Sequence, residues 1–464
     1  MLDLVEKVLK YVEGLTDYAE VRYENASGSR FIVKNGVLEA TDISKTFGIA
    51  IRYLKKGFLG TLYSNNLEFA KLKALIDETV KKASTRILKK PIEFSKEKVY
   101  NDSYEVKQKI NLKDVSQEEK IKAVLEIEKA LKNKSLAMRY FELYDEFKEK
   151  IYVNSEGSRI ISKVPRIGFE YVLTLIANND SEQRSFQYGG SGGWEIFNGW
   201  NLIEKLTKEA DMLAKLSKAK KLIKGKYDVI LAPEIVGIAS HESCGHPYEA
   251  DRILGREAAQ AGKSFVTPEM LGQRIGSNVI NVADDPTLPD SYGFYLYDEE
   301  GLKAERRILM KNGLINSFLQ NRETAAELKT QSNGSARANA WYNEPLVRMA
   351  NTFVVPGNHS FEELLESIKN GVYIKTYMEW NIDDKRFNQK YTGLEAYMIE
   401  NGELKQLVKR PALEITTPKF WSSIDAVGKD LDFVAGNCGK GDPMSPVPVW
   451  FGGPHIRLRN IILV

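Results

Sequence analysis

Histidine and cysteine are scarce in this 464-residue chain, which contains four of the former and two of the latter. Two cysteines cannot build a disulfide framework, so we expect a reducing, cytoplasmic location. A formal net charge of +3 gives no electrostatic reason to expect nucleic-acid binding. No apolar run is long enough to span a bilayer, and charged residues interrupt the opening segment, which is typical of an amphipathic helix rather than a signal peptide. We therefore expect neither nucleic-acid nor membrane partners.

The chain is too long for one hydrophobic core, so it is expected to contain several domains. Short apolar runs broken by turn residues such as Asn35-Gly36 predict antiparallel hairpins, and helical segments stand between them. The fold class expected is α+β, with antiparallel β-sheets flanked by helices. We predict an N-terminal α+β domain at residues 1–93, a middle α+β domain at 94–222, and a larger, β-rich C-terminal domain at 223–464. The glycine-rich stretch "YGGSGG" from Tyr188 favours a mobile loop, and residues 202–222 favour a helix.

The stretch "HESCGHPYEADR", residues 241–252, contains two of the four histidines and one of the two cysteines. A metal-dependent hydrolase needs metal ligands of this kind, an open coordination position and a nearby carboxylate. His241 and His246 are candidate ligands, and Glu242 is a candidate base. A five-residue spacing rotates the two imidazoles about 140° apart on a regular helix, too far to share one ion. Pro247 cannot continue a regular helix, because its ring clashes with the carbonyl of Ser243. The helix must kink, end or take a one-residue π-bulge there, and the extra residue of a bulge would bring His246 back over His241. We predict that this local distortion makes the five-residue spacing workable.

A zinc site usually needs a third protein ligand. The candidates are Cys244, Glu249, Asp251 and Cys438. Binding by Cys244 beside both histidines would strain the short segment, whereas Glu249 and Asp251 could bind directly or orient an imidazole. Cys438 lies in "AGNCGKGDP", where glycines allow close approach of the backbone, and a thiolate suits zinc. Residue types alone leave Cys438 and Glu249 nearly equal.

The motif "HESCGHPYEAD" resembles the H-E-x-x-x-H-x-x-E-x-D signature of the TldD/PmbA peptidase family. The resemblance extends to "VADDPTLPDSYGFYLYDEEG", "EPLVRMANTFVVPG" and "GNCGKGDP", and so covers most of the chain from residue 227 onward. The segments "KNGVLEA" and "GIAIRYLKKGFLGTLYS" are similar to the first domain of that family, and residues 95–220 match loosely.

The resemblance implies a zinc metallopeptidase that hydrolyses unfolded or short peptides, with one Zn²⁺ per active site in the C-terminal domain. His241, His246 and Cys438 would be the metal ligands, and Glu242 the general base that activates a zinc-bound water. The family usually forms heterodimers with a catalytically silent TldE/PmbA subunit, and a homodimer is the other expectation. Cys244 departs from the family pattern, and its role is open.

Further residues are candidates for supporting roles. The oxyanion donor could be His359, His455, Arg337 or Arg348. Arg337, Arg348 and Asn351 are also candidates to line the peptide path, and Glu249 and Asp251 to support the ligands. Two alternatives are a non-catalytic, peptide-binding regulatory subunit of a TldD/TldE-like complex and a purely structural metal site. The intact set of His241, Glu242 and His246 favours the enzyme.

Overall fold

The computed structural model describes residues 1–85, 88–177, 180–257 and 262–464. Its first large element is a seven-stranded sheet with the order β3-β2-β1-β5-β6-β4, in which β7 also pairs with β6. The strands are β1 (Tyr18–Lys34), β2 (Val37–Lys55), β3 (Phe58–Ser64), β4 (Asn101–Glu105), β5 (Met138–Asn154), β6 (Arg159–Ala177) and β7 (Asp180–Gly190). The hairpin predicted at Asn35-Gly36 is confirmed: both residues have positive φ, as a tight turn between β1 and β2 requires.

This sheet contains strands from the predicted N-terminal domain and from the predicted middle domain. β1 pairs antiparallel with β2 on one side and with β5 on the other. Residues 1–93 and 94–222 therefore contribute to one continuous layer, and the boundaries at 93/94 and 222/223 stay predictions.

The C-terminal part of the chain builds two larger sheets and one short strand pair. The six-stranded sheet contains β10 (Val282–Asp284), β11 (Arg307–Lys311), β12 (Leu314–Ile315), β15 (Asn351–Val354), β23 (Asp432–Cys438) and β24 (Val447–Gly453). The ten-stranded sheet contains β8 (Lys220–Lys221), β9 (Gly225–Leu231), β16 (Asn370–Ile374), β17 (Tyr377–Ile382), β18 (Asn388–Gly393), β19 (Ala396–Glu400), β20 (Glu403–Lys409), β21 (Ala412–Thr416), β22 (Ile424–Val427) and β25 (Ile456–Leu463). The pair is β13 (Ala336–Arg337) with β14 (Leu346–Val347).

The helices flank these sheets, which confirms the expected α+β class. They are α1 (Leu2–Glu13), α2 (Phe69–Ser84), α3 (Gln117–Leu131), α4 (Trp194–Gly199), α5 (Leu202–Leu216), α6 (Pro233–Ser240), α7 (Ala250–Ile253), α8 (Arg322–Glu327), α9 (Phe361–Glu366) and α10 (Thr417–Ser422). The sheets are mixed rather than purely antiparallel, because β9 runs parallel to β16 and β15 runs parallel to β24. Among the described residues, no helix is long and apolar enough to cross a membrane.

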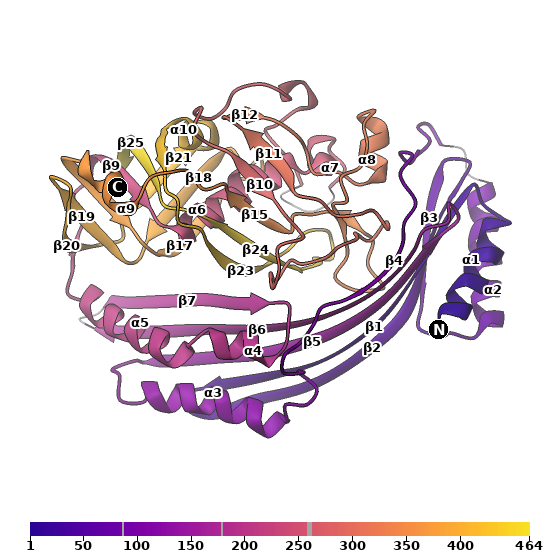
Figure 1. The fold of residues 1–464 in the computed structure, drawn as a ribbon, viewed down its shortest axis with the longest axis horizontal. Helices are drawn as coiled ribbons and strands as arrows, with labels where there is room; N and C mark the ends of the chain where they lie inside the picture. Colours follow the sequence, from indigo (N-terminus) through magenta and orange to yellow (C-terminus); the bar gives the residue numbers. More distant parts are fainter. Residues whose placement is uncertain (86–87, 178–179, 258–261) are drawn as a thin grey trace.

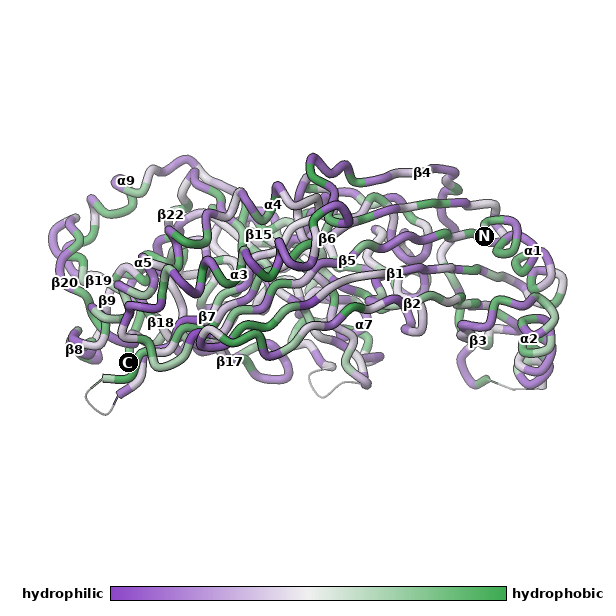
Figure 2. Tube along the Cα trace, turned by 90° about the horizontal axis from the view of Figure 1, so that it is seen from below, coloured by the Kyte–Doolittle hydropathy of each residue, from purple (hydrophilic) through white to green (hydrophobic). Residues whose placement is uncertain are grey.

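The seven-stranded sheet curves around the C-terminal part of the chain, which lies on its concave side (Figure 1). Helices α1 and α2 lie at the end that carries β3, and α3, α4 and α5 lie on the side away from the C-terminal part. Figure 2 shows the sheet from below, running along the length of the molecule with the N-terminus near one end and β8 and β20 near the other. Buried ion pairs hold the concave face: Arg22 donates to Glu299 at 3.1 Å, and Arg52 bridges Glu20 and Glu300.

Two local predictions were wrong. The helix expected over 202–222 ends at Leu216, and Lys220–Lys221 form the short strand β8. The glycine-rich stretch is not a loop throughout, since β7 continues to Gly190 and α4 begins at Trp194. Its glycines allow close packing instead: a Cβ on Gly189 would lie 2.8 Å from the Tyr292 ring, and one on Gly193 would lie 2.1 Å from the Ile110 carbonyl.

Candidate metal centre

The histidine-bearing segment leaves helical geometry where Pro247 predicts that it should. Helix α6 begins with Pro233 in its first turn and runs to Ser240. Residues His241–Gly245 then form a π-helical turn, in which the His246 amide donates to the carbonyl of His241, five residues earlier. A short 3₁₀ turn follows at His246–Tyr248. The predicted π-bulge is therefore confirmed, and its wider turn returns His246 to the side of His241.

Packing partners stabilise this irregular turn. Pro247 has no amide hydrogen for the Ser243 carbonyl, which instead accepts a 3.0 Å hydrogen bond from the indole nitrogen of Trp421, a fully buried residue on α10. Gly245 allows the side chain of Met349 to pack directly on the turn, because a Cβ there would lie 1.8 Å from the Met349 sulfur. The turn thus depends on tertiary contacts as well as on its own sequence.

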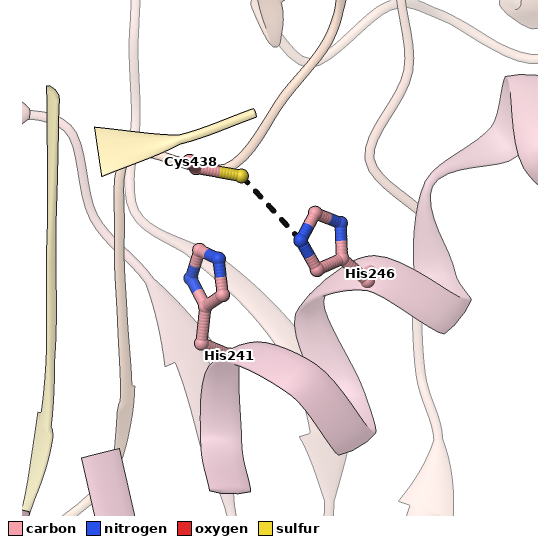
Figure 3. Close-up of side chains that lie close together, drawn as sticks. All are labelled: His241, His246 and Cys438. Carbon is pink, nitrogen blue, oxygen red and sulfur yellow. Dashed lines mark hydrogen bonds between the residues drawn. The ribbon is translucent and has the colours of Figure 1, made fainter. Parts of the chain in front are cut away.

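Both imidazoles and the thiol of Cys438 point toward one another (Figure 3). Candidate ligand atoms of these three residues all lie within 4.8 Å of each other, and the three side chains are buried. Cys438 comes from the last position of β23, 192 residues from His246, and its Sγ lies 3.4 Å from His246 Nε2. Sequence reasoning left Cys438 and Glu249 nearly equal as the third ligand, and the fold places Cys438 beside the histidines.

The protonation states of these groups suit metal binding. Burial lowers the pKa of His241, and Arg386 and Arg348 lower it further against the opposing charges of Glu242 and Glu249. Burial also lowers the pKa of His246. Burial raises the pKa of Cys438, but His246 and Arg348 outweigh it and bring the pKa of the thiol to about 6. The imidazoles and the thiol therefore lose their protons more readily than free side chains do, which favours metal binding.

Glu249 lies behind His246 rather than among the converging atoms. Its Oε2 lies 3.0 Å from His246 Nδ1, on the side of the ring away from Cys438, and accepts from Arg252 at 2.6 Å. Lys440 lies 3.1 Å from the same carboxylate and donates to Asp251 at 2.7 Å. Burial raises the pKa of Glu249, but the positive charges of Lys440, His246 and Arg252 outweigh this effect. The pKa of Glu249 therefore lies well below its usual range. This buried network fixes the orientation of the His246 ring.

Glu242 faces the same cavity as the two imidazoles. Its Oε2 accepts a 2.7 Å hydrogen bond from the guanidinium of Arg386, and both side chains are nearly buried. Arg386 lies in the turn between β17 and β18 with φ of 64°. Sequence reasoning missed this arginine, and the only local signal was the charged turn "DDKRFN" between two strand-like runs.

The remaining candidates lie in different surroundings. Arg348 is fully buried and donates to the carbonyls of Cys438 and Ser445, so it supports the segment that contains Cys438. Asn351 is also fully buried and bonds to the backbone of Asp285, Gly293 and Trp450.

The other two histidines belong to a different part of the C-terminal fold. His359 Nδ1 lies 3.2 Å from the Val427 carbonyl. His455 lies between Asp430, at 2.6 Å, and the Tyr373 hydroxyl, at 3.0 Å. Cys244 is fully buried in the C-terminal core, where burial raises the pKa of its thiol well above the usual value. Its environment is that of a packed, unreactive thiol.

The converging residues open onto a cavity of about 390 Å³ between the C-terminal part and the curved sheet. The lining includes residues of β7 and of β23, together with His241, Glu242, His246, Arg386 and Cys438. The two imidazoles, the thiol, the Glu242 carboxylate and the Arg386 guanidinium thus face one cavity, which is large enough to admit part of a small ligand.

Three family models cover most of the chain. They are described as PmbA/TldA metallopeptidase domain 1, matching residues 19–83, the central domain, matching 110–218, and the C-terminal domain, matching 224–463. The third alone spans more than half of the sequence and contains every residue of the candidate metal centre.

Individual proteins are similar over nearly their full lengths. A metalloprotease of Methanocaldococcus jannaschii is 34% identical over 461 residues, which are 98% of this chain and 99% of that protein. A zinc metalloprotease TldD homolog of Saccharolobus solfataricus is 28% identical over 473 residues, 98% of each chain. The crystal structure of TldE from Thermococcus kodakarensis has the same fold, with a TM-score of 0.76, 18% identity and coverage of 99% of this chain and 100% of that one.

Proposed function

Because the chain belongs to the PmbA/TldD metallopeptidase family and is a metalloprotease, we propose that it is a zinc-dependent peptidase that hydrolyses unfolded or short peptides. One observation carries the proposal: His241, His246 and Cys438 converge within 4.8 Å in a cavity that also contains the Glu242 carboxylate. The intact constellation argues against a non-catalytic binding subunit. A purely structural metal would have no use for Glu242 or for an adjoining cavity.

The donor set fits zinc. Tetrahedral zinc ligands at about 2.1 Å for nitrogen and about 2.3 Å for sulfur lie about 3.5 Å from each other. The 3.4 Å between Cys438 Sγ and His246 Nε2 agrees with this spacing. The second nitrogen of His246 has a carboxylate partner in Glu249, which is the usual arrangement behind a metal-binding imidazole. The three residues therefore suit a site that keeps one coordination position for the reaction.

The roles proposed for the protein groups follow from this geometry. Zinc would supply Lewis-acid activation of a water molecule and polarisation of the scissile carbonyl. Glu242 accepts the proton of the attacking water as the new carbon–oxygen bond forms, and delivers it to the leaving amine as the carbon–nitrogen bond breaks. Arg386 holds the Glu242 carboxylate in place and, among the described residues that line the cavity, is the one arginine or lysine. It is a better candidate for the oxyanion donor than the two remote histidines.

Metal removal tests the proposed function. The zinc-loaded protein is expected to cleave an unstructured peptide, and treatment with a chelator followed by dialysis should abolish cleavage because Glu242 alone cannot activate water sufficiently. Peptide products would be measured by mass spectrometry, with re-addition of zinc as the control. Full cleavage by a zinc-free sample would contradict the proposal.

A second subunit is also proposed, either TldE/PmbA-like or a copy of this chain. The segment 37–47 of β2 is exposed throughout, and within the described ranges it pairs only with β1. Its exposed apolar side chains include Val37 and Ile43, which are 62% and 60% accessible. A bare strand edge with apolar side chains favours pairing with another chain.

Light scattering tests this assembly, with the protein purified alone and together with a TldE/PmbA-like protein from the same source. We expect a two-chain mass in at least one sample and a shift toward single chains in Ile43→Lys, because a lysine on the edge disfavours strand addition. Ile223→Lys is the matched control, since Ile223 is 80% exposed and lies outside this edge. A single-chain mass in both wild-type samples would reject the proposed subunit.

A further inference from the structure

A second cavity, of about 260 Å³, lies between the concave face of the curved sheet and the C-terminal part of the chain. Charged residues of β5 and β6 line it on one side, and segments near residues 292–299, 336–339 and 446–448 line it on the other. Asn437 contributes to this cavity and to the metal-centre cavity, and it directly precedes Cys438. The two spaces therefore adjoin at the ligand-bearing end of β23.

Among the residues that the structure describes, two arginines of this cavity donate hydrogen bonds to backbone carbonyls only. Arg337 is 7% exposed and donates to the Met349 carbonyl at 2.6 Å and to the Pro448 carbonyl at 2.8 Å. Arg166 is half-buried and donates to the carbonyls of Tyr292 and Phe294 at 3.0 and 2.9 Å. Within the described ranges, neither guanidinium has a carboxylate oxygen within 4.0 Å.

The carboxylates that line the cavity already have partners. Glu299 pairs with Lys150 and, at 3.1 Å, with Arg22 from outside the cavity. Glu146 lies 3.4 Å from Lys148.

Asp298 accepts from the backbone amides of Glu300, Leu302 and Ala336 at 2.9 to 3.0 Å. In the described ranges Arg337 therefore has no ion-pair partner, and Arg166 interacts with Glu146, which faces it across the β5–β6 ladder and is shared with Lys148. Burial lowers the pKa of Arg337 to about 10; Tyr295 opposes this shift, and Arg166 and Arg348 add to it.

An uncompensated buried cation is costly unless an anion accompanies it. Guanidinium groups match the planar, two-oxygen geometry of a carboxylate. We propose that this cavity is a subsite for a carboxylate of the peptide substrate, held by Arg337 and Arg166 while the neighbouring bond lies at the metal centre. The inference rests on the proposed peptidase function. The carboxylate could be the C-terminus of the peptide or an acidic side chain near it.

Four peptides of one sequence distinguish these sources: a free acid and a C-terminal amide, each with either Gln or Glu as the penultimate residue. Their binding to the full-length, chelator-treated protein would be measured by fluorescence anisotropy, and their kcat/KM would be measured on the zinc-loaded protein. The amide with Gln is expected to bind at least about tenfold more weakly than the best carboxylate peptide, because it lacks the anion. If the C-terminus is the ligand, the free acid with Gln binds tightly; if the side chain is, the amide with Glu does.

The affinity ratio between the best carboxylate peptide and the amide with Gln measures the discrimination. Arg166→Gln and Arg337→Gln should each reduce this ratio to about twofold or less, whereas Arg166→Lys should keep part of it because the charge remains. Arg274→Gln is the matched control, since Arg274 also donates to backbone carbonyls, those of Gly276 and Asn312, but lies outside the cavity. Melting temperatures would show whether each variant folds. If Arg337→Gln does not, the half-buried Arg166 carries the test.

Equal binding of all four peptides to the wild type, or discrimination that survives in both folded Gln variants, would overturn the inference. The proposed function fails differently. Carboxylate-dependent binding without any zinc-dependent turnover would uphold the subsite while rejecting the peptidase. Efficient turnover of all four peptides with equal kcat/KM and equal binding would uphold the peptidase and reject the carboxylate subsite.

Discussion

Glu242→Gln is expected to lower kcat for peptide hydrolysis by about 10²- to 10⁴-fold, the range typical for loss of a general base. Glutamine has nearly the same shape as glutamate and can still accept a hydrogen bond from Arg386, but it cannot take a proton from the attacking water. Glu242 does not belong to the converging ligand set, so about one zinc ion per chain should remain bound. Steady-state kinetics with an unstructured peptide, together with metal analysis of the same sample, would measure both quantities.

A matched control exists on the same helical segment. Glu234 also pairs with a buried arginine, Arg184, at 2.7 Å, but it does not line the metal-centre cavity. Glu234→Gln should therefore retain kcat within a small factor if the protein folds. Equal kcat for the wild type and Glu242→Gln would reject Glu242 as the base, and loss of zinc from Glu242→Gln would show that the carboxylate acts on the metal instead.

Cys438→Ala is expected to lose both zinc and activity. Removal of a residue that merely supports a ligand costs about 10- to 100-fold in metal affinity, so removal of a direct ligand should cost more than about 100-fold. The two remaining imidazoles do not complete a zinc site. Zinc content after dialysis against a competing chelator would be measured by elemental analysis.

The two cysteines of this chain allow a closely matched comparison. Cys244 is also fully buried and lies in the same turn as the histidines, yet it packs in the hydrophobic core. Cys244→Ala should keep about one zinc per chain. The zinc affinity of Glu249→Gln should fall between those of these two variants, about 10- to 100-fold below that of the wild type, because the substitution weakens the hydrogen bond to His246 Nδ1. Full zinc retention by Cys438→Ala would move the third ligand to Glu249 or Cys244.

The local geometry of the site could be predicted from twelve residues. A five-residue histidine spacing is unusable on a regular helix, and Pro247 excludes a regular helix at that position. Both facts are short-range and steric, so they hold whatever surrounds the segment. The π-helical turn at His241–Gly245 is a distortion that these facts allow, and contacts from Trp421 and Met349 stabilise it. The capping boxes at Ser116 and Ser360 are equally local features, because the interacting groups lie three residues apart.

Other features required the assembled fold. Cys438 and Glu249 are both reasonable ligands by residue type, and only the position of β23 above the π turn distinguishes them. Trp421, which satisfies the freed Ser243 carbonyl, is 178 residues away in sequence, and Arg386, which pairs with Glu242, is 144 residues away. The glycines after Tyr188 predicted a loop, but two of them allow close packing against distant groups: Gly189 against the Tyr292 ring and Gly193 against the Ile110 carbonyl.

The sequence by itself determined the fold class, the hairpin at Asn35-Gly36, the bulge at the histidines and the family, since these depend on local sterics, periodicity and motif. Tertiary structure decided which thiol joins the imidazoles, which arginine contacts Glu242, and where the two cavities adjoin. It also joined strands of both predicted N-terminal domains into one sheet. Those outcomes depend on contacts between residues more than a hundred positions apart, and no local pattern encodes which distant groups burial will bring together.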